Sequence, residues 1–190
     1  MTRLCVFCGS SAGRDPAYLE SAREVGATLA ERGIGVVYGG SRVGLMGALA
    51  DAVLERGGEI IGVIPQALLA REMAHRGIVD LRIVDSMHAR KALMAELADG
   101  FVALPGGLGT LEEFTEIVTW AQLGIHAKPC GLLNLGGFYD PFLGFLDHLV
   151  EAGFVPPSTR GLVLAAATIT DLLEAFDIIS HDTRRVQVRC

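Results

Sequence analysis

Short apolar runs alternate with longer amphipathic stretches along almost the whole chain. An apolar run of about four to eight residues is typical of a buried strand, and apolar residues at helical spacing are typical of a helix that packs on a sheet. Strands and helices in regular alternation predict βαβ units, which give a parallel sheet with helices on both faces. We therefore expect a doubly wound α/β domain.

The pattern also assigns residue ranges to these elements. Strands are predicted at Leu4–Cys8, Gly35–Tyr38, Ile60–Ile64, Ile78–Val84, Phe101–Leu104 and Cys130–Asn134. Helices are predicted at Pro16–Arg32, Leu45–Arg56, Met87–Ala98, Thr110–Leu123 and Pro141–Glu151, the last one capped by Asp140. A short apolar element and a helix are expected between Val163 and Phe176. One domain would thus span residues 1–180, followed by a polar tail at 181–190.

Composition and charge exclude several classes of protein. Hydrophobic residues make up 51% of the 190 residues and charged residues 20%, a balance that excludes intrinsic disorder and favours a large core or a surface covered by another subunit. The net charge of −6 argues against a nucleic acid partner, because neutralising phosphates needs a basic surface. No apolar run reaches the roughly 18 residues of a membrane span. With no evident export signal, we expect a cytoplasmic protein without a membrane partner.

Glycine and small hydroxyl residues gather in turns, where ligands of a doubly wound sheet bind. These turns contain Cys8–Ser11, Gly39–Ser41, Gly44 with Gly47, and Pro105–Thr110. In the last turn Gly106, Gly107 and Gly109 let backbone N–H groups approach a ligand, Thr110 adds a hydroxyl, and the next helix adds its dipole. An ordinary tight turn is the alternative for any one of them. Together they favour a nucleotide, although none matches a Walker A loop or the spaced dinucleotide fingerprint.

The helix after the last glycine turn carries three glutamates. At about 100° per residue, its buried arc is predicted at Leu111, Phe114, Ile117, Val118 and Ala121. Glu112 and Glu116 fall on the opposite side, where we expect solvated side chains. Glu113 lies at the edge of the arc beside the glycine turn, and we expect it to be the functional carboxylate. A favourable acid near a helix N-terminus is the alternative for all three.

Two cations stand in the first turn of another helix, which begins after Ser86 as a plausible N-cap. Arg90 and Lys91 oppose the dipole of that helix, and Arg90 falls inside its apolar arc. Because cations are unfavourable in the first turn of a helix, their presence at the sheet edge where ligands bind favours a functional role. The alternative is an Arg90 side chain that extends to a neighbouring carboxylate such as Glu72 or Glu96.

Other chemistry-bearing residues lack the spacing that a site would need. Cys5 and Cys8 form a C-x-x-C pair inside a predicted strand, so their side chains would point to opposite faces as core thiols. The histidines show no metal-ligand spacing, and the chain has no G-x-S-x-G turn. The sequence therefore predicts neither a metal site nor a serine triad.

The motifs taken together resemble one known family. The residues that carry the resemblance are Cys5–Ser11, Tyr38–Ser41, Gly44–Gly47, Met87–Lys91 and Pro105–Glu113, with further likeness through Trp120–His126 to about Ala166. On these motifs the chain is similar to the Lonely Guy (LOG) family of cytokinin riboside 5′-monophosphate phosphoribohydrolases. The aromatic residue often found in the middle of the family's glycine motif is Leu108 here.

The resemblance implies a Rossmann-like homodimer that needs no cofactor. It would cleave the N-glycosidic bond of AMP or of an N6-modified AMP, and release the free base and ribose 5-phosphate. By position, Arg90 and Glu113 correspond to the family's catalytic pair, and Glu72 would lie near the partner subunit. The residues expected to bind the nucleotide are Ser10, Gly40, Met87, Lys91, Gly106, Gly107, Gly109 and Thr110.

Two questions stay open at this point: whether the chain is an enzyme or a carrier, and which group protonates the leaving base. A carrier that binds a nucleotide or cofactor without hydrolysing it, as in the related molybdenum-cofactor carrier proteins, is the second functional interpretation. The Arg90–Glu113 pair favours the enzyme, since a carrier has no need of an acid beside its phosphate site. A guanidinium group is too weak an acid to donate a proton near pH 7, which excludes Arg90 as a general acid. The leaving base would then take its proton from water, His88 or a partner residue.

Overall fold

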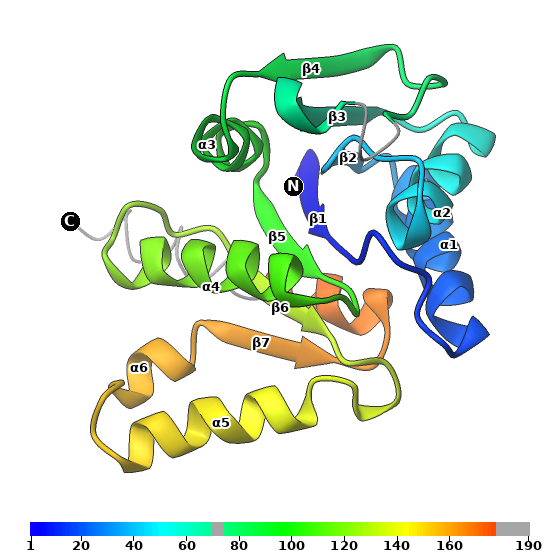
Figure 1. Cartoon of the computed structure of the whole chain (residues 1–190). Helices are drawn as coiled ribbons and strands as arrows, with labels where there is room; N and C mark the ends of the chain where they lie inside the picture. The colour runs from blue at the N-terminus through cyan, green and yellow to red at the C-terminus, as the bar shows by residue number, and fades with distance from the viewer. Residues whose placement is uncertain (70–73, 178–190) are drawn as a thin grey trace.

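Parallel strands form one seven-stranded sheet in the computed structural model, which describes residues 1–69 and 74–177. Their order across the sheet is β4-β3-β2-β1-β5-β6-β7 (Figure 1). The sheet grows outward from β1 in both directions, and the carboxyl ends of β1 and β5 meet where the direction changes, which is where ligands bind in such folds. The strands are β1 (Arg3–Phe7), β2 (Gly35–Tyr38), β3 (Ile60–Pro65), β4 (Asp80–Val84), β5 (Gly100–Ala103), β6 (Cys130–Leu133) and β7 (Val163–Ala166).

Helices cover both faces of the sheet. The α-helices are α1 (Pro16–Glu31), α2 (Gly44–Glu55), α3 (Met87–Leu97), α4 (Leu108–Gln122), α5 (Asp140–Glu151) and α6 (Pro157–Arg160), with 3₁₀ turns η1 (Gln66–Leu68) and η2 (Leu135–Gly137). Helices α1 and α2 and the helical residues 169–177 pack on one face. Helices α3, α4 and α5 pack on the other. Among the described residues, no helix is both long and apolar enough to cross a bilayer.

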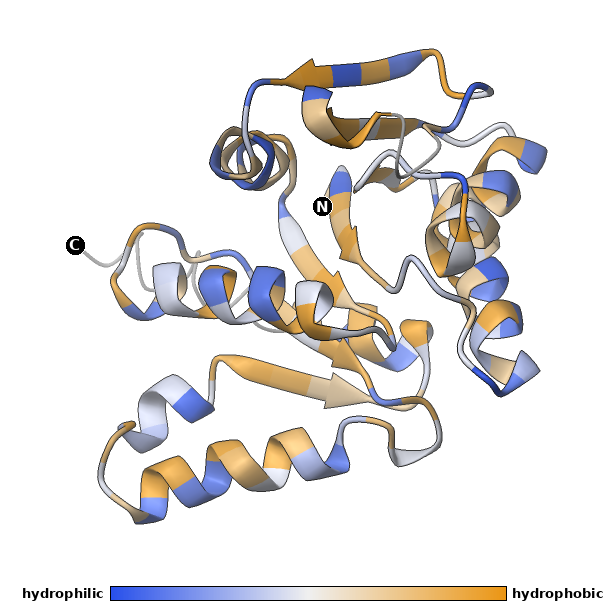
Figure 2. Cartoon of the chain, viewed as in Figure 1, coloured by the Kyte–Doolittle hydropathy of each residue, from blue (hydrophilic) through white to orange (hydrophobic). Residues whose placement is uncertain are grey.

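Strands β2, β3, β5 and β6 are apolar because helices cover both of their faces, whereas the edge strand β4 also contains the hydrophilic residues Asp80 and Arg82 (Figure 2). Cys5 belongs to the core cluster with α3 and α4, whereas Cys8 belongs to the cluster with α1 and α2. Both are buried and free, so the prediction of core thiols on opposite faces is confirmed. Burial raises the pKa of each thiol above its ordinary value.

The predicted doubly wound α/β fold is confirmed, and the predicted strands and helices agree with the structure to within two residues at each end. The strand predicted from Ile78 begins at Asp80, because the amide of Ile78 donates to the His75 carbonyl in a turn. The short helix α6 carries no apolar periodicity and was not predicted. The predicted tail at 181–190 lies outside the described residues.

The start of α5 differs from the prediction. Asp140 is the first residue of the helix, and Tyr139 occupies the capping position. The side chain of Asn134 explains this, since its oxygen accepts from the Tyr139 amide at 2.7 Å and its nitrogen donates to the Asp140 carboxylate at 2.7 Å. The Asp140 carboxylate is thus bound to the preceding loop, and it does not cap the helix.

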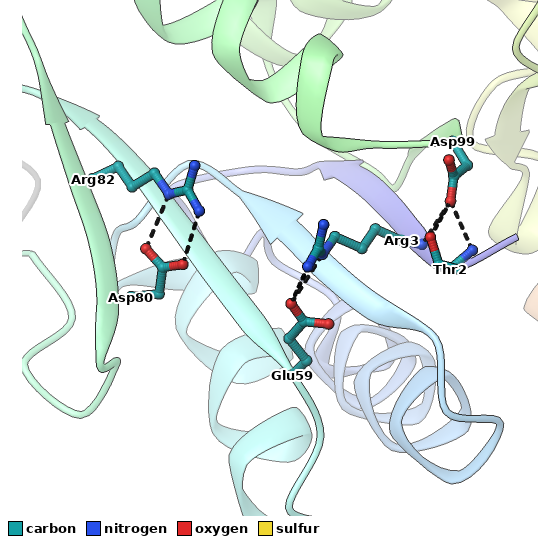
Figure 3. A network of polar contacts seen from close by, with 6 residues as sticks. All are labelled: Thr2, Arg3, Glu59, Asp80, Arg82 and Asp99. Atoms are coloured by element: carbon teal, nitrogen blue, oxygen red, sulfur yellow. Dashed lines mark hydrogen bonds and ion pairs between the residues drawn. The ribbon is translucent and has the colours of Figure 1, made fainter.

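Polar contacts close the amino edge of the sheet (Figure 3). Arg3 donates to the Glu59 carboxylate at 2.7 Å, and Asp99 accepts from the hydroxyl and amide of Thr2 and from the amide of Arg3. Burial alone would raise the pKa of Asp99, but these hydrogen bonds hold it below its ordinary value. This edge is therefore occupied by its own side chains, and it lies opposite the carboxyl edge that carries the glycine turns.

Candidate active site

A pocket of about 300 Å³ opens at the carboxyl edge of the sheet, where β1, β2 and β5 end. It is enclosed by the turns that follow these strands and by the first turns of α2, α3 and α4. The lining residues are Val6, Phe7, Cys8, Gly9, Ser10, Gly39, Met46, Met87, Arg90, Gly107, Leu108, Gly109, Thr110, Glu112 and Glu113.

Backbone hydrogen bonds hold the three loops around this pocket together. The Gly9 amide donates to the Pro105 carbonyl at 3.2 Å, which joins the turn after β1 to the turn after β5. The Gly9 carbonyl accepts from the Leu45 amide at 3.0 Å, which joins the same turn to α2. These contacts fix the glycine turns as one rigid wall of the pocket.

Helix α4 begins at the pocket without a side-chain cap. Its N-cap residue is Gly107, which has no side chain to accept from the first-turn amides. Gly106 must be glycine, because a Cβ there would lie 2.1 Å from the hydroxyl oxygen of Thr110. The buried Thr110 hydroxyl and the start of α4 therefore converge on one wall, an arrangement that suits an anion.

Arg90 reaches into the pocket from α3, with a side chain that is only 6% exposed. Its Nε donates to the Val63 carbonyl at 3.1 Å and its Nη2 to the Gly39 carbonyl at 3.0 Å. Both carbonyls stand at the carboxyl ends of strands, so the fold fixes the plane of the guanidinium. Its third nitrogen, Nη1, lies 3.7 Å from the Glu113 carboxylate and 3.8 Å from the Met87 sulfur.

Glu113 faces Arg90 from the first turns of α4, and its side chain is 12% exposed. The prediction of a partly desolvated carboxylate beside the glycine turn agrees with this position. Cys8 lines the same pocket, and burial, reinforced by the charge of Glu113, raises the pKa of its thiol. The thiol is therefore protonated at neutral pH, which makes it an unsuitable nucleophile.

Lys91 is buried and does not line the pocket. Its ammonium forms ion pairs with the Glu112 carboxylate and, at 2.9 Å, with the Glu116 carboxylate. Glu112 is exposed, as expected for a solvated side chain, and Glu116 is partly buried, but the ion pairs of both with Lys91 were not predicted. The helical wheel considers α4 alone, whereas the partner of both glutamates comes from α3.

The structure brings most of the residues predicted for the site together. Gly106 lines a neighbouring pocket of about 220 Å³, beside Tyr18 and Phe138. Gly40 and Lys91 line neither pocket. The predicted residues that line the main pocket are Ser10, Met87, Arg90, Gly107, Gly109, Thr110 and Glu113. Glu72 lies outside the described residues.

Sequence reasoning missed Gly39 and Met46, which line the pocket. The signal for Gly39 was available, because Val37 faces α3 and side chains alternate along a strand. Gly39 therefore continues the α3 face, while Gly40 lies against Ile64 and Leu81. His88, a predicted candidate proton donor, is exposed and does not line the pocket. Within residues 1–69 and 74–177, no cluster of acidic, histidine or cysteine side chains could hold a metal ion.

Comparison with known proteins gives close relatives. The family model described as "Possible lysine decarboxylase" matches residues 46–176. The cytokinin riboside 5′-monophosphate phosphoribohydrolase LOG of Oryza sativa subsp. japonica is 52% identical over 171 residues, which cover 90% of this chain and 71% of the relative. The cytokinin riboside 5′-monophosphate phosphoribohydrolase LOG7 of Arabidopsis thaliana is 49% identical over 175 residues, which cover 92% of this chain and 81% of the relative.

The chain belongs to the Lonely Guy family. The resemblance predicted from its motifs is thereby confirmed.

More distant solved structures have the same fold as this LOG-family chain. The molybdenum cofactor carrier protein of Chlamydomonas reinhardtii superposes with a TM-score of 0.69 at 23% identity, covering 95% of this chain and 98% of the carrier. The molybdenum cofactor binding protein of Rippkaea orientalis gives 0.69 at 20% identity, with 94% and 96% covered. At such identities the likeness concerns the fold alone.

Proposed function

We propose that this LOG-family chain is a phosphoribohydrolase that acts on cytokinin riboside 5′-monophosphates, which are N6-modified forms of AMP, and on AMP itself. It cleaves the N-glycosidic bond and releases the free base and ribose 5-phosphate. The observation that carries the proposal is the Arg90–Glu113 pair, held 3.7 Å apart in a pocket beside the uncapped start of α4. The named activity of relatives about 50% identical supports the same reaction.

The phosphate end of the substrate fits the start of α4. Gly107, Gly109 and Thr110 line the pocket there, and the first-turn amides together with the helix dipole favour an anion. Ser10 lies on the adjoining turn, which is bonded to the glycine turn through Gly9. A 5′-phosphate bound at this wall places the ribose toward Glu113.

Glu113 stabilises the reacting ribose in this proposal. As the C–N bond breaks, both electrons leave with the base and positive charge builds on the sugar. A fixed carboxylate in a partly dry pocket stabilises that charge and orients the water whose oxygen adds to the ribose carbon. The water gives up a proton as ribose 5-phosphate forms.

Arg90 acts by charge and position, because its guanidinium stays protonated near neutral pH. Two backbone carbonyls and Glu113 hold it at the pocket wall, where it stabilises negative charge on the phosphate or on the departing base. His88 is exposed outside the pocket. Water or a residue of a second subunit therefore remains as the proton donor for the leaving purine.

The second candidate function, a carrier without hydrolase activity, has less support. Its argument is the shared fold of the molybdenum cofactor carriers, which are at most 23% identical to this chain. Nothing in simple binding of an anionic ligand calls for the buried Glu113 carboxylate beside the start of α4. We therefore favour the enzyme.

A homodimer forms part of the proposal. Helix α5 has no buried residue although it is apolar on one side, and Phe145 on it is 55% exposed. Phe154, just beyond the same helix, is 82% exposed. A groove between α4 and α5 is lined mainly by apolar side chains such as Val118 and Leu146. A second copy that covers this face would account for the high apolar content of the chain.

The remaining features of the proposal concern the organisation and location of the protein. We place residues 1–180 in one nucleotide-binding domain that functions in the cytoplasm, with residues 181–190 as a polar tail. Cys5, Cys8 and Cys130 are free and buried, which is compatible with a reducing compartment. No nucleic acid partner is expected for a chain of net charge −6.

Removal of the 5′-phosphate from the substrate tests the phosphate wall. We expect adenosine to react at least about 100-fold more slowly than AMP, measured as kcat/KM for release of adenine, because phosphate binding supplies energy that is used at the reacting bond. Inosine 5′-monophosphate serves as a control that keeps the phosphate and changes the base. Equal rates with adenosine and AMP would contradict a phosphate site at the start of α4.

A further inference from the structure

An ion cluster with a buried lysine at its centre joins α3 to α4 beside the pocket. Its centre is the Lys91 ammonium on α3, which lies 2.9 Å from the Glu116 carboxylate and is also paired with Glu112, both on α4. Lys91 is 6% exposed as a residue and does not line the pocket. Figure 1 shows the two helices on the same side of the sheet as separate elements, so this cluster bridges them.

The cluster and the candidate catalytic pair are neighbours in sequence on both helices. Arg90 and Lys91 are consecutive on α3, and Glu112 and Glu113 are consecutive on α4. Arg90 faces Glu113 inside the pocket, and Lys91, which does not line the pocket, pairs with Glu112 at its wall. Any shift of α4 relative to α3 that stretches the ion pairs of Lys91 therefore also moves Glu113 relative to Arg90.

The two sides of the pocket are fixed by different means. The Arg90 guanidinium donates to the carbonyl of Val63 in β3 and to the carbonyl of Gly39, which directly follows β2. Glu113 belongs to α4, whose first turn follows a glycine-rich loop. The ion pairs of Lys91 on α3 with Glu112 and Glu116 hold the same turns of α4 and can therefore fix the position of Glu113.

We propose that Lys91 is a positioning residue, which holds α4 against α3 and so fixes Glu113 opposite Arg90 at the distance that the reaction needs. The proposal rests on the proposed function. It differs from the expectation that Lys91 binds the substrate, because Lys91 does not line the pocket and its ammonium is already paired with two carboxylates of α4.

The electrostatics of the cluster support this role. Burial would lower the pKa of the Lys91 ammonium, but hydrogen bonds to Glu112 and Glu116 hold it above its ordinary value. Lys91 therefore stays charged throughout the neutral range. Without the ammonium, the two carboxylates of α4 would repel each other and lose their shared partner, so this turn of α4 would no longer be anchored to α3.

The first test is Lys91→Met, which keeps most of the unbranched side chain and removes its charge. We expect kcat for AMP to fall by about 10- to 100-fold while KM changes less than about threefold, because a small displacement of a catalytic group affects the transition state more than binding. Lys91→Arg should recover most of the rate. Lys128→Met is the matched control, since Lys128 is the other lysine of the chain and its ammonium donates to the Ala95 carbonyl, away from the pocket. It should retain the wild-type kcat.

A double-mutant comparison separates positioning from a general structural role. If Lys91 acts through Glu113, Lys91→Met should lower kcat little further in a Glu113→Gln background, whereas an independent role gives multiplied losses. Should Lys91→Met fail to fold, as judged by thermal unfolding, Glu116→Gln weakens the same contact and should lower kcat with little change in KM. If the wild-type protein turns over AMP and Lys91→Met does so at the same rate, the positioning role is overturned and the proposed function is not. Where Lys91→Met does not fold, the same rate in Glu116→Gln has this meaning. A wild-type protein that binds AMP and releases no base would overturn the proposed function, and the positioning role with it.

Discussion

Glu113→Gln is expected to lower the turnover of AMP by about 100-fold or more while the nucleotide still binds. The substitution keeps the size of the side chain, but it replaces one carboxylate oxygen by an amide NH2 group and removes the negative charge that faces the developing ribose cation. Because Glu113 is 12% exposed and lies 3.7 Å from Arg90, water does not readily replace that charge. The measurement is kcat from the release of free base, with the dissociation constant of AMP determined by calorimetry.

The control for this variant is Glu24→Gln, which makes the same chemical change on an exposed position of α1. It should keep wild-type turnover. Loss of AMP binding by Glu113→Gln would assign Glu113 to substrate binding, and near-normal release of base would remove it from catalysis. Either result contradicts its role as the carboxylate that stabilises the transition state.

Gly39→Ala is expected to reduce kcat/KM by a similar factor, about 100-fold, although no charged residue is replaced. A Cβ at this position would lie 2.1 Å from Nη2 of Arg90 and 2.9 Å from the Met46 sulfur, so the guanidinium must leave its place. The hydrogen bond from Arg90 to the Gly39 carbonyl would be lost or distorted at the same time. Steady-state kinetics with AMP and a thermal unfolding curve measure the two consequences.

Gly144→Ala provides the matched glycine control. Gly144 lies inside α5, and a Cβ there meets no atom within 4 Å. The control should leave kcat/KM unchanged, because alanine also favours the helix. If Gly39→Ala retained full activity, the guanidinium position described here would have no part in the reaction.

The sequence predicted most of the fold because its apolar runs are short, regular and separated by amphipathic helices. It also predicted that Arg90 and Glu113 are functional, although they are 23 positions apart in the chain. The reason is topological: the turns before both residues lie at the carboxyl edge of one parallel sheet, so unusual residues there come close together.

The errors concern contacts between elements that one helix or one turn cannot reveal. Glu112 and Glu116 are on the polar side of α4 when that helix is considered alone, yet Lys91 of α3 pairs with both. Asp140 has the residue type of a helix cap, but the side chain of Asn134 binds it first. In each case the deciding partner comes from outside the local sequence pattern.

The choice between Gly39 and Gly40 illustrates a different limit. Both follow β2 in a glycine pair, and the resemblance pointed to Gly40. Because side chains alternate along a strand, Gly39 lies on the face of α3, where it contacts Arg90. Gly40 has a positive φ of 77°, in the left-handed region that favours glycine. Counting along the strand from Val37 would have made this distinction.

The most direct test of the account is the fate of the glycosidic bond. Purified protein is incubated with AMP and, separately, with N6-isopentenyl-AMP, and the products are separated by chromatography. We predict free base and ribose 5-phosphate in equal amounts, formed catalytically by the wild-type protein and at least about 100-fold more slowly by Glu113→Gln. Recovery of both nucleotides intact, although calorimetry shows that they bind, would contradict the account and identify the protein as a carrier.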